Sequence, residues 1–469
     1  MFKIGIIGGG TAGATTALEL GKLGLDITLF EKNNSLISGP PFCHLHAGGN
    51  LYREISTNQC ITLLKQSIEF LKKFPYAIDN RPTVIAVPKR DDQEAIDLIP
   101  RLKTIQNEYK KLILDNSSNK VLGEVQEYFK LYNKDDIEKL KKRDDVKRPK
   151  SSDEWMIVVA KNLDFNKLKF PIVMVQEYGL NLFSLSAGIS LALDEISNCK
   201  ILLNSEVMDI KQNRLWNLSY KDQNDQVLNE EFDYIINASG FSTGKIDDMI
   251  GFKKNRFVEF KAAYITKWEE NNKLWPEIIF HGKRGSKDGM GQFTPYKNNY
   301  FQLHGMTEDI TLFKNGLAKS TTTSANPKLD QRFLNKIKTS WNNIDYDKRT
   351  KKAIEHISYF IPNFSKALVG AKPLFGAQQI PGNDKDLRAA DLSFEDNNYL
   401  RCEIVKVSSV FTMIELIIEK FTKLGYLDKK NLQTNKITKV NNKILTKKAE
   451  EISLDRNYPK SLATIVNPL

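Results

Sequence analysis

The first 31 residues, MFKIGIIGGGTAGATTALELGKLGLDITLFE, contain the pattern that decides the fold. An apolar segment over residues 3–7 leads into the glycine-rich turn 8–13, and a helical pattern over 14–23 follows it. A second apolar segment, 26–30, ends in Glu31. This order of strand, glycine turn, helix, strand and acid is typical of the βαβ unit that binds a dinucleotide.

Each part of the turn has a physical role in that unit. Gly8 permits the tight turn, Gly10 lets the backbone approach a pyrophosphate, and Gly13 lets the helix pack closely on the sheet. The helix N-terminus offers free N–H groups to the phosphates. Glu31, about 20 residues past the turn, can accept hydroxyls of an adenosine ribose. The alternative is a purely structural glycine turn. The expected dinucleotide contacts are Gly8, Gly10, Thr11, Ala12, Gly13, Glu31 and Lys32.

Length and composition indicate a cytoplasmic globular protein. The 469 residues suffice for two or three domains, with 41% hydrophobic and 27% charged residues. No apolar run reaches the length of a membrane span, and the N-terminus lacks the pattern of a secretory signal. The four cysteines show no metal-binding spacing, so we expect free thiols and no metal site.

The chain carries a net charge of +12, for which three explanations compete. They are a solvated basic surface, attraction to an anionic membrane surface, and attraction to nucleic acid. The lysines are scattered, and the densest runs, 139–150 and 429–448, are not interleaved with aromatic residues. This pattern argues against nucleic acid and leaves peripheral membrane association open.

The remaining patterns predict an α/β protein with a Rossmann-type domain, an antiparallel-sheet domain and a helical insertion. Helices are expected over 50–75, 182–197, 327–360 and 411–424, with charged helices over 93–145. Alternating segments between 257 and 306 predict antiparallel strands. The expected domains are a discontinuous nucleotide-binding domain (1–80, 170–250, 365–425), a helical insertion or cap (81–169), a substrate domain (251–364) and a basic C-terminal extension (426–469).

A second motif suggests which dinucleotide binds. The buried apolar segment 232–237 ends in the turn Asn237-Ala238-Ser239-Gly240. Together with the N-terminal unit, this order resembles the D-amino-acid oxidase-like superfamily of FAD-dependent oxidoreductases, of the second glutathione-reductase type. The resemblance implies FAD rather than NAD. It also implies cofactor contacts from Val207, Ala238, Ser239 and Gly240.

Two further segments resemble flavin-contacting parts of that superfamily. Residues 45–49, Leu-His-Ala-Gly-Gly, are similar to a segment of the dimethylglycine and sarcosine dehydrogenases whose histidine carries the flavin covalently, although the preceding Trp is missing here. The segment 38–51 is also similar to a loop of malate:quinone oxidoreductase. For His46, covalent attachment, packing at the flavin and a structural role all stay open. Lys406 and Ser408 occupy the place of a glycine turn that faces the flavin, where positive charge stabilises its reduced form. The alternative for Lys406 is a surface lysine. The further contacts implied are His46, Ala47, Gly48, Gly49, Lys406 and Ser408.

The strands between 280 and 307 contain the candidate catalytic residues. Arg284 could bind a substrate carboxylate through both arms of its guanidinium. His281 or His304 could accept a proton as hydride leaves, and the alternative for each is an ordinary strand residue.

The resemblance implies removal of a hydride from a small carboxylate-bearing amine or 2-hydroxy acid. Oxygen, a quinone or a carrier protein would receive the electrons. Two alternatives are a flavin-dependent tRNA-modifying enzyme and a catalytically silent FAD-binding protein.

Overall fold

The computed structural model describes residues 2–39, 45–49, 55–387, 392–428 and 440–468. Its first sheet has six strands in the order β19-β20-β12-β1-β2-β8. All neighbouring pairs are parallel except β19 with β20. The Rossmann unit predicted at the N-terminus is therefore confirmed. The strands are β1 Lys3–Ile7, β2 Asp26–Phe30, β8 Cys199–Leu202, β12 Tyr234–Asn237, β19 Leu392–Glu395 and β20 Tyr399–Cys402.

Helix α1 (Thr11–Lys22) follows the glycine turn directly and packs against β2, α6 (Leu182–Asp194) and α10 (Val410–Lys423). Its first turns consist of small residues that are buried, which allows the close approach to the sheet. Asn181 is the N-cap of α6, and its side-chain oxygen accepts hydrogen bonds from the N–H groups of Phe183 and Ser184.

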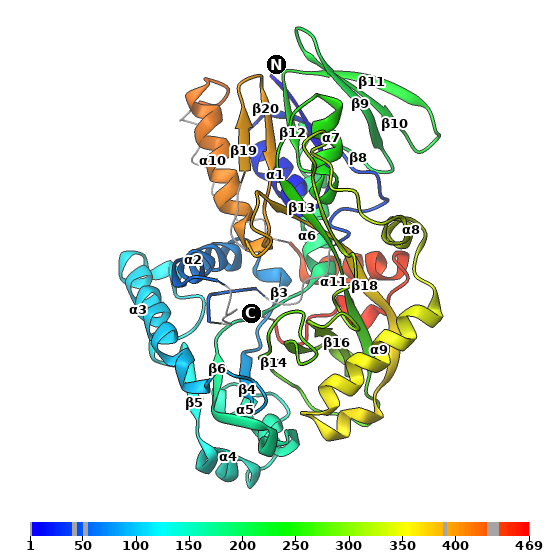
Figure 1. Cartoon of the computed structure of the whole chain (residues 1–469). Helices are drawn as coiled ribbons and strands as arrows, with labels where there is room; N and C mark the ends of the chain where they lie inside the picture. Colours follow the sequence, from blue (N-terminus) through cyan, green and yellow to red (C-terminus); the bar gives the residue numbers. More distant parts are fainter. Residues whose placement is uncertain (1, 40–44, 50–54, 388–391, 429–439, 469) are drawn as a thin grey trace.

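The second sheet has nine strands, in the order β17-β13-β16-β15-β14-β4-β6-β5, with β18 also paired to β13. In Figure 1, strands β4, β6 and β14 of this sheet lie in the lower half of the view, below β12, β19 and β20 of the first sheet. The antiparallel strands predicted between 257 and 306 are confirmed as β13 to β16. The strands are β4 Thr83–Pro88, β5 Phe129–Tyr132, β6 Leu168–Val175, β13 Arg256–Lys267, β14 Glu277–Phe280, β15 Gly291–Pro295, β16 Tyr300–Gly305, β17 Leu317–Lys319 and β18 Leu368–Pro381.

One segment differs from the sequence expectation. The 93–145 region includes helices α3 (Ile99–Asp115) and α4 (Lys134–Lys141), but Phe129 and Leu131 lie in strand β5 rather than in a helix. Strand β5 belongs to the second sheet, so the 81–169 segment is not purely helical. The segment 368–381, punctuated by glycine and proline, forms one long strand because it pairs along most of β13. The domain boundaries given above stay a proposal.

The remaining strands form two smaller sheets, one of three strands and one of two. Within the described residues, no helix combines the length and apolar character needed to cross a bilayer. The remaining α-helices are α2 Thr57–Lys73, α5 Ser152–Asn162, α7 Thr243–Met249, α8 Gln331–Thr339, α9 Asn343–Ser358 and α11 Asn442–Asp455. The remaining strands are β3 Ile78–Asp79, β7 Gly179–Leu180, β9 Glu206–Gln212, β10 Trp216–Lys221 and β11 Val227–Phe232.

The C-terminal extension is part of the folded molecule. Helix α11 packs against α6 and buries Leu445, Ala449 and Ile452. The chain then continues along α6, where the side chain of Asn181 donates a hydrogen bond to the carbonyl oxygen of Leu462 over 2.8 Å. Residues 440–468 therefore cover α6, a helix that packs against α1 of the Rossmann unit.

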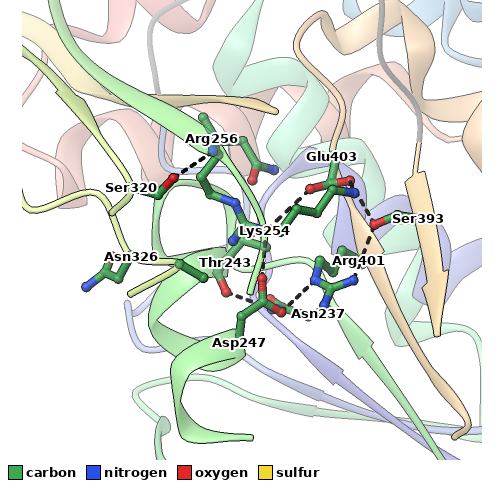
Figure 2. Close-up of polar contacts among 12 residues, drawn as sticks. Asn237, Thr243, Asp247, Lys254, Arg256, Ser320, Asn326, Ser393, Arg401 and Glu403 are labelled. Atoms are coloured by element: carbon green, nitrogen blue, oxygen red, sulfur yellow. Dashed lines mark hydrogen bonds and ion pairs between the residues drawn. The ribbon is translucent and has the colours of Figure 1, made fainter. Parts of the chain in front are cut away.

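A buried ionic network joins the two sheets (Figure 2). Asp247 on α7 contacts Arg256 on β13 and Arg401 on β20, each over 2.6 Å. Arg256 also lies 3.4 Å from Glu403, the residue after Cys402 at the end of β20. These charged side chains are almost completely buried. The network thus fixes β20, and the segment that follows it, to the second sheet.

Replacing Asp247 by asparagine should destabilise the protein by about 3–5 kcal/mol, because two buried guanidinium groups lose their shared counter-charge. Chemical denaturation monitored by circular dichroism would measure the loss. The matched control is Glu419→Gln, which removes an exposed ion pair with Lys423 and should leave the midpoint unchanged. A loss below about 1 kcal/mol for Asp247→Asn would show that the network is not essential to stability.

Candidate active site

A cavity of about 230 Å³ is lined by residues from both sheets. The glycine turn and the turn after β12 form one side, and strands β13, β15, β16 and β18 contribute to the other. The segment between β20 and α10 completes it. The lining residues are Gly10, Thr11, Ala12, Gly39, His46, Ala238, Gly240, Phe241, Lys261, Gln292, His304, Met306, Ala377, Gln378, Gln379, Cys402, Ile404, Val405, Lys406, Val407 and Ser408.

The three glycines of the N-terminal motif have different surroundings. Gly8 has a φ of +101°, and a Cβ there would lie 2.6 Å from the carbonyl oxygen of Ala238. A Cβ on Gly13 would lie 1.9 Å from the carbonyl oxygen of Gly8, whereas a Cβ on Gly10 would meet no atom within 4 Å. No side chain caps the N-terminus of α1. The open space at Gly10 and the helix N–H groups beside it therefore suit a pyrophosphate.

Glu31 is buried at the end of β2 and already has several hydrogen-bond donors. Its carboxylate accepts from the Gly9 N–H over 2.7 Å and from the Asn33 N–H and side-chain amide over 2.8 and 2.6 Å. Burial raises the pKa of Glu31. A carboxylate has about four acceptor positions, so there is room for about one further donor, such as a ribose hydroxyl.

The other predicted contacts of this half lie near the turn after β12. Ala238 and Gly240 line the cavity, while Ser239 donates its N–H and hydroxyl to the side chain of Asn237. The Lys32 ammonium lies 5.1 Å from the centre of the Phe241 ring. Val207 is buried in a separate apolar cluster that includes Phe30. Lys32, Val207 and Ser239 do not line the cavity.

His46 and Lys406 come together at the cavity from opposite ends of the chain. The Lys406 ammonium lies 3.0 Å from Nε2 of His46, and Ser408 also lines the cavity. The side-chain amides of Gln378 and Gln379 donate to the carbonyl oxygens of Val405 and Cys402 over 2.6 and 2.9 Å. Strand β18 therefore fixes the segment that presents Lys406.

The backbone around His46 is held from several directions. The Ala47 N–H donates to Glu177 and its carbonyl accepts from the Tyr128 hydroxyl, both over 3.0 Å. Gly48 has a φ of +88°, and a Cβ there would lie 2.5 Å from the carbonyl oxygen of Cys60. Ala47, Gly48 and Gly49 support His46 without lining the cavity. Residues 40–44 and 50–51 of the expected flavin segment, with Cys43, lie outside the described residues.

His304 is the candidate catalytic histidine that lines the cavity. Its Nε2 lies 3.1 Å from the Gln302 amide nitrogen, and the Tyr296 hydroxyl donates to the amide oxygen of Gln302 over 3.0 Å. Since that oxygen already accepts from Tyr296, the amide nitrogen donates to His304. Neutral His304 then carries its proton on Nδ1.

The other two candidates lie elsewhere. His281 is buried after β14, and neither it nor Arg284 lines the cavity. Arg284 forms an ion pair with Glu259 on β13. The same carboxylate lies 3.0 Å from Lys261, and it is Lys261 that lines the cavity.

Lys261 is a lining residue that the sequence patterns above do not single out. Its ammonium donates to the side-chain oxygen of Gln378 over 2.8 Å. The signal that could have found it is its spacing of two residues from Glu259, with apolar residues at 258, 260 and 262, which puts both charged side chains on one face.

The lining of the cavity has a clear charge preference. It contains two lysines and two histidines, and no acidic residue occurs among the described residues that line it. Such a site favours an anionic ligand. Across the described residues, no group of three or more His, Cys, Asp or Glu side chains is placed to hold a metal ion. Cys60, Cys199 and Cys402 are free thiols, as predicted.

Comparison with known proteins supports the N-terminal assignment. Residues 6–39 match the family model of the NAD(P)-binding Rossmann-like domain. No curated protein sequence matches the chain.

Several solved structures share the overall fold. L-proline dehydrogenase from P. horikoshii has a TM-score of 0.57 at 15% identity, covering 98% of this chain and 99% of that one. Glycine oxidase from Geobacillus kaustophilus has a TM-score of 0.56 at 11% identity, covering 90% and 95%. L-α-glycerophosphate oxidase from Mycoplasma pneumoniae, solved with FAD bound, has a TM-score of 0.55 at 13% identity, covering 90% and 95%. The chain therefore has the fold of the FAD-dependent oxidoreductases that its glycine turn and 237–240 motif resemble.

Proposed function

We propose that this protein is an FAD-dependent oxidoreductase that removes a hydride from a small carboxylate-bearing amine or 2-hydroxy acid. The observation that carries the proposal is the cavity, which extends from Gly10 to the second sheet and presents Lys261, Lys406, His46 and His304. FAD, when bound, supplies the ring that accepts the hydride.

The residues present fit FAD along this path. Gly10 and the N-terminus of α1 would hold the pyrophosphate, and Glu31 would accept a ribose hydroxyl. His46, Lys406 and Ser408 would contact the flavin. Lys406 would place positive charge beside the cofactor, which stabilises its reduced form.

Lys261 would bind the substrate carboxylate, in place of the Arg284 expected from the sequence. His304 would contact the substrate from the lining of the cavity, with its Nε2 held by the side chain of Gln302. The electrons would pass to oxygen, a quinone or a carrier protein, and peripheral membrane association would suit the last two.

The first experiment is a visible spectrum of the purified protein before and after acid precipitation. We expect the two absorption bands of oxidised flavin, and anaerobic bleaching by a member of a panel of amino acids and 2-hydroxy acids. Colour that stays in the pellet would indicate covalent attachment and direct attention to His46. A protein that lacks colour and takes up no added FAD would overturn the proposal. Colour that dithionite bleaches but no panel member does would overturn the substrate class.

A further inference from the structure

Arg456, the residue that follows α11, makes four side-chain hydrogen bonds. Its guanidinium donates to the carbonyl oxygens of Leu36 and Ile37 over 2.6 and 3.0 Å. It also donates to the hydroxyls of Ser35 and Ser186 over 3.1 and 3.3 Å. Three of these four acceptors lie in the short loop after Glu31, so Arg456 links the C-terminal extension directly to this loop of the nucleotide-binding unit.

The loop needs such support because its backbone is strained. Ile37 has a φ of +57°, a conformation that β-branched residues rarely adopt. The Ile37 N–H donates to the carbonyl oxygen of Gly9 over 2.9 Å, and Leu36 packs so closely on Gly9 that a Cβ there would lie 2.6 Å from it. The N–H of the same Gly9 donates to Glu31. A shift of residues 35–37 would therefore displace both the glycine turn and the carboxylate.

We propose that Arg456 is a positioning residue for the dinucleotide. Its guanidinium donates hydrogen bonds to two carbonyl oxygens of a strained turn and holds that turn against Gly9. It thereby keeps the Glu31 carboxylate and the N-terminus of α1 in their binding positions. The identity of the bound dinucleotide as FAD rests on the proposed function. The positioning role itself concerns the adenosine half and applies to any ligand that carries ADP.

The test compares Arg456→Met and Arg456→Lys with wild type, using ADP and FAD as ligands in calorimetric titrations. We expect Arg456→Met to raise the Kd for ADP by about tenfold, the loss expected for charge-assisted hydrogen bonds that no longer hold the turn. Arg456→Lys, which keeps the charge but not the planar fork, should give a smaller rise. Hydrogen exchange in the ligand-free protein should show faster exchange at the Ile37 amide in both variants.

The matched control is Tyr458→Phe, which removes a hydrogen bond of 2.7 Å from the same extension to the carbonyl oxygen of Pro373. It should leave both the ADP affinity and the Ile37 exchange rate unchanged. Equal effects of Tyr458→Phe and Arg456→Met would indicate general docking and overturn the inference, as would an ADP Kd within about twofold of wild type. If Arg456→Met does not fold, Arg456→Lys decides by the same criteria. A wild-type protein that binds ADP but not FAD would contradict the proposed function. The inference about Arg456 would still be tested by the ADP titrations.

Discussion

Replacing Gly10 by valine is expected to weaken FAD binding by about a thousandfold while the protein stays folded. A Cβ on Gly10 would meet no protein atom within 4 Å, and the backbone there, with φ −65° and ψ −176°, is accessible to valine. The added methyl groups would project into the cavity where the pyrophosphate is expected. Loss of the hydrogen bonds from α1 to the phosphates, together with steric exclusion, accounts for about 4 kcal/mol. Flavin fluorescence titration measures the affinity, and thermal unfolding verifies the fold.

The matched control is the same substitution at Gly13. A Cβ there would lie 1.9 Å from the carbonyl oxygen of Gly8, so Gly13→Val should prevent close packing of α1 on the sheet and yield little folded protein. Substitution of two glycines in the same motif is thus expected to affect different properties, FAD binding at Gly10 and folding at Gly13. A Gly10→Val protein that binds FAD as tightly as wild type would show that the phosphates do not occupy this turn.

The local parts of the fold were predictable because their signals are local. The segments 3–7 and 26–30 correspond to β1 and β2 as the structure has them, since a glycine turn, a helical period and two apolar strands lie within one short stretch. The 182–197 pattern likewise predicts α6, which ends at Asp194. In each of these segments the periodicity of the apolar residues and the turn chemistry agree.

Elements defined by distant pairing were not predictable in the same way. Strand β5 lies in a charged region with helical periodicity, and it is a strand because Phe129 to Tyr132 pair with β6. Strand β18 contains glycine and proline, which weaken the pattern of a strand in the sequence, and it is a strand because it pairs along β13. The energy that selects these strands comes from partners far away in the sequence, which a local pattern does not contain.

The cavity shows the same limit. His46, Lys261, His304 and Lys406 meet only because β13, β16 and the segment before α10 are brought together. Alternation along a strand predicts that Glu259 and Lys261 share a face, but not that this face lines the cavity. The sequence pattern therefore favours Arg284, but in the structure the Arg284 guanidinium pairs with Glu259.

Replacing Lys261 by methionine should lower kcat/KM by about a hundredfold for the amino or hydroxy acid that bleaches the flavin. Methionine keeps the length of the side chain but removes the charge proposed to bind the carboxylate, a loss of about 3 kcal/mol. Most of the effect should be in KM, because the carboxylate is charged in the substrate and in the transition state alike. Steady-state kinetics with the acid and with its neutral amide would measure it. The amide should react at similar rates with both proteins.

The control is Arg284→Met, because Arg284 shares Glu259 with Lys261 but does not line the cavity. In either variant Glu259 keeps one cationic partner, so both proteins should fold and bind FAD normally. A KM that rises only in Lys261→Met assigns the carboxylate to Lys261. If the rise occurs only in Arg284→Met, the loop after β14 reaches the substrate and the expectation from the sequence is correct. If neither KM changes, the positive charge at this end of the cavity does not bind the substrate carboxylate, and Lys406 becomes the remaining lysine of the lining to test.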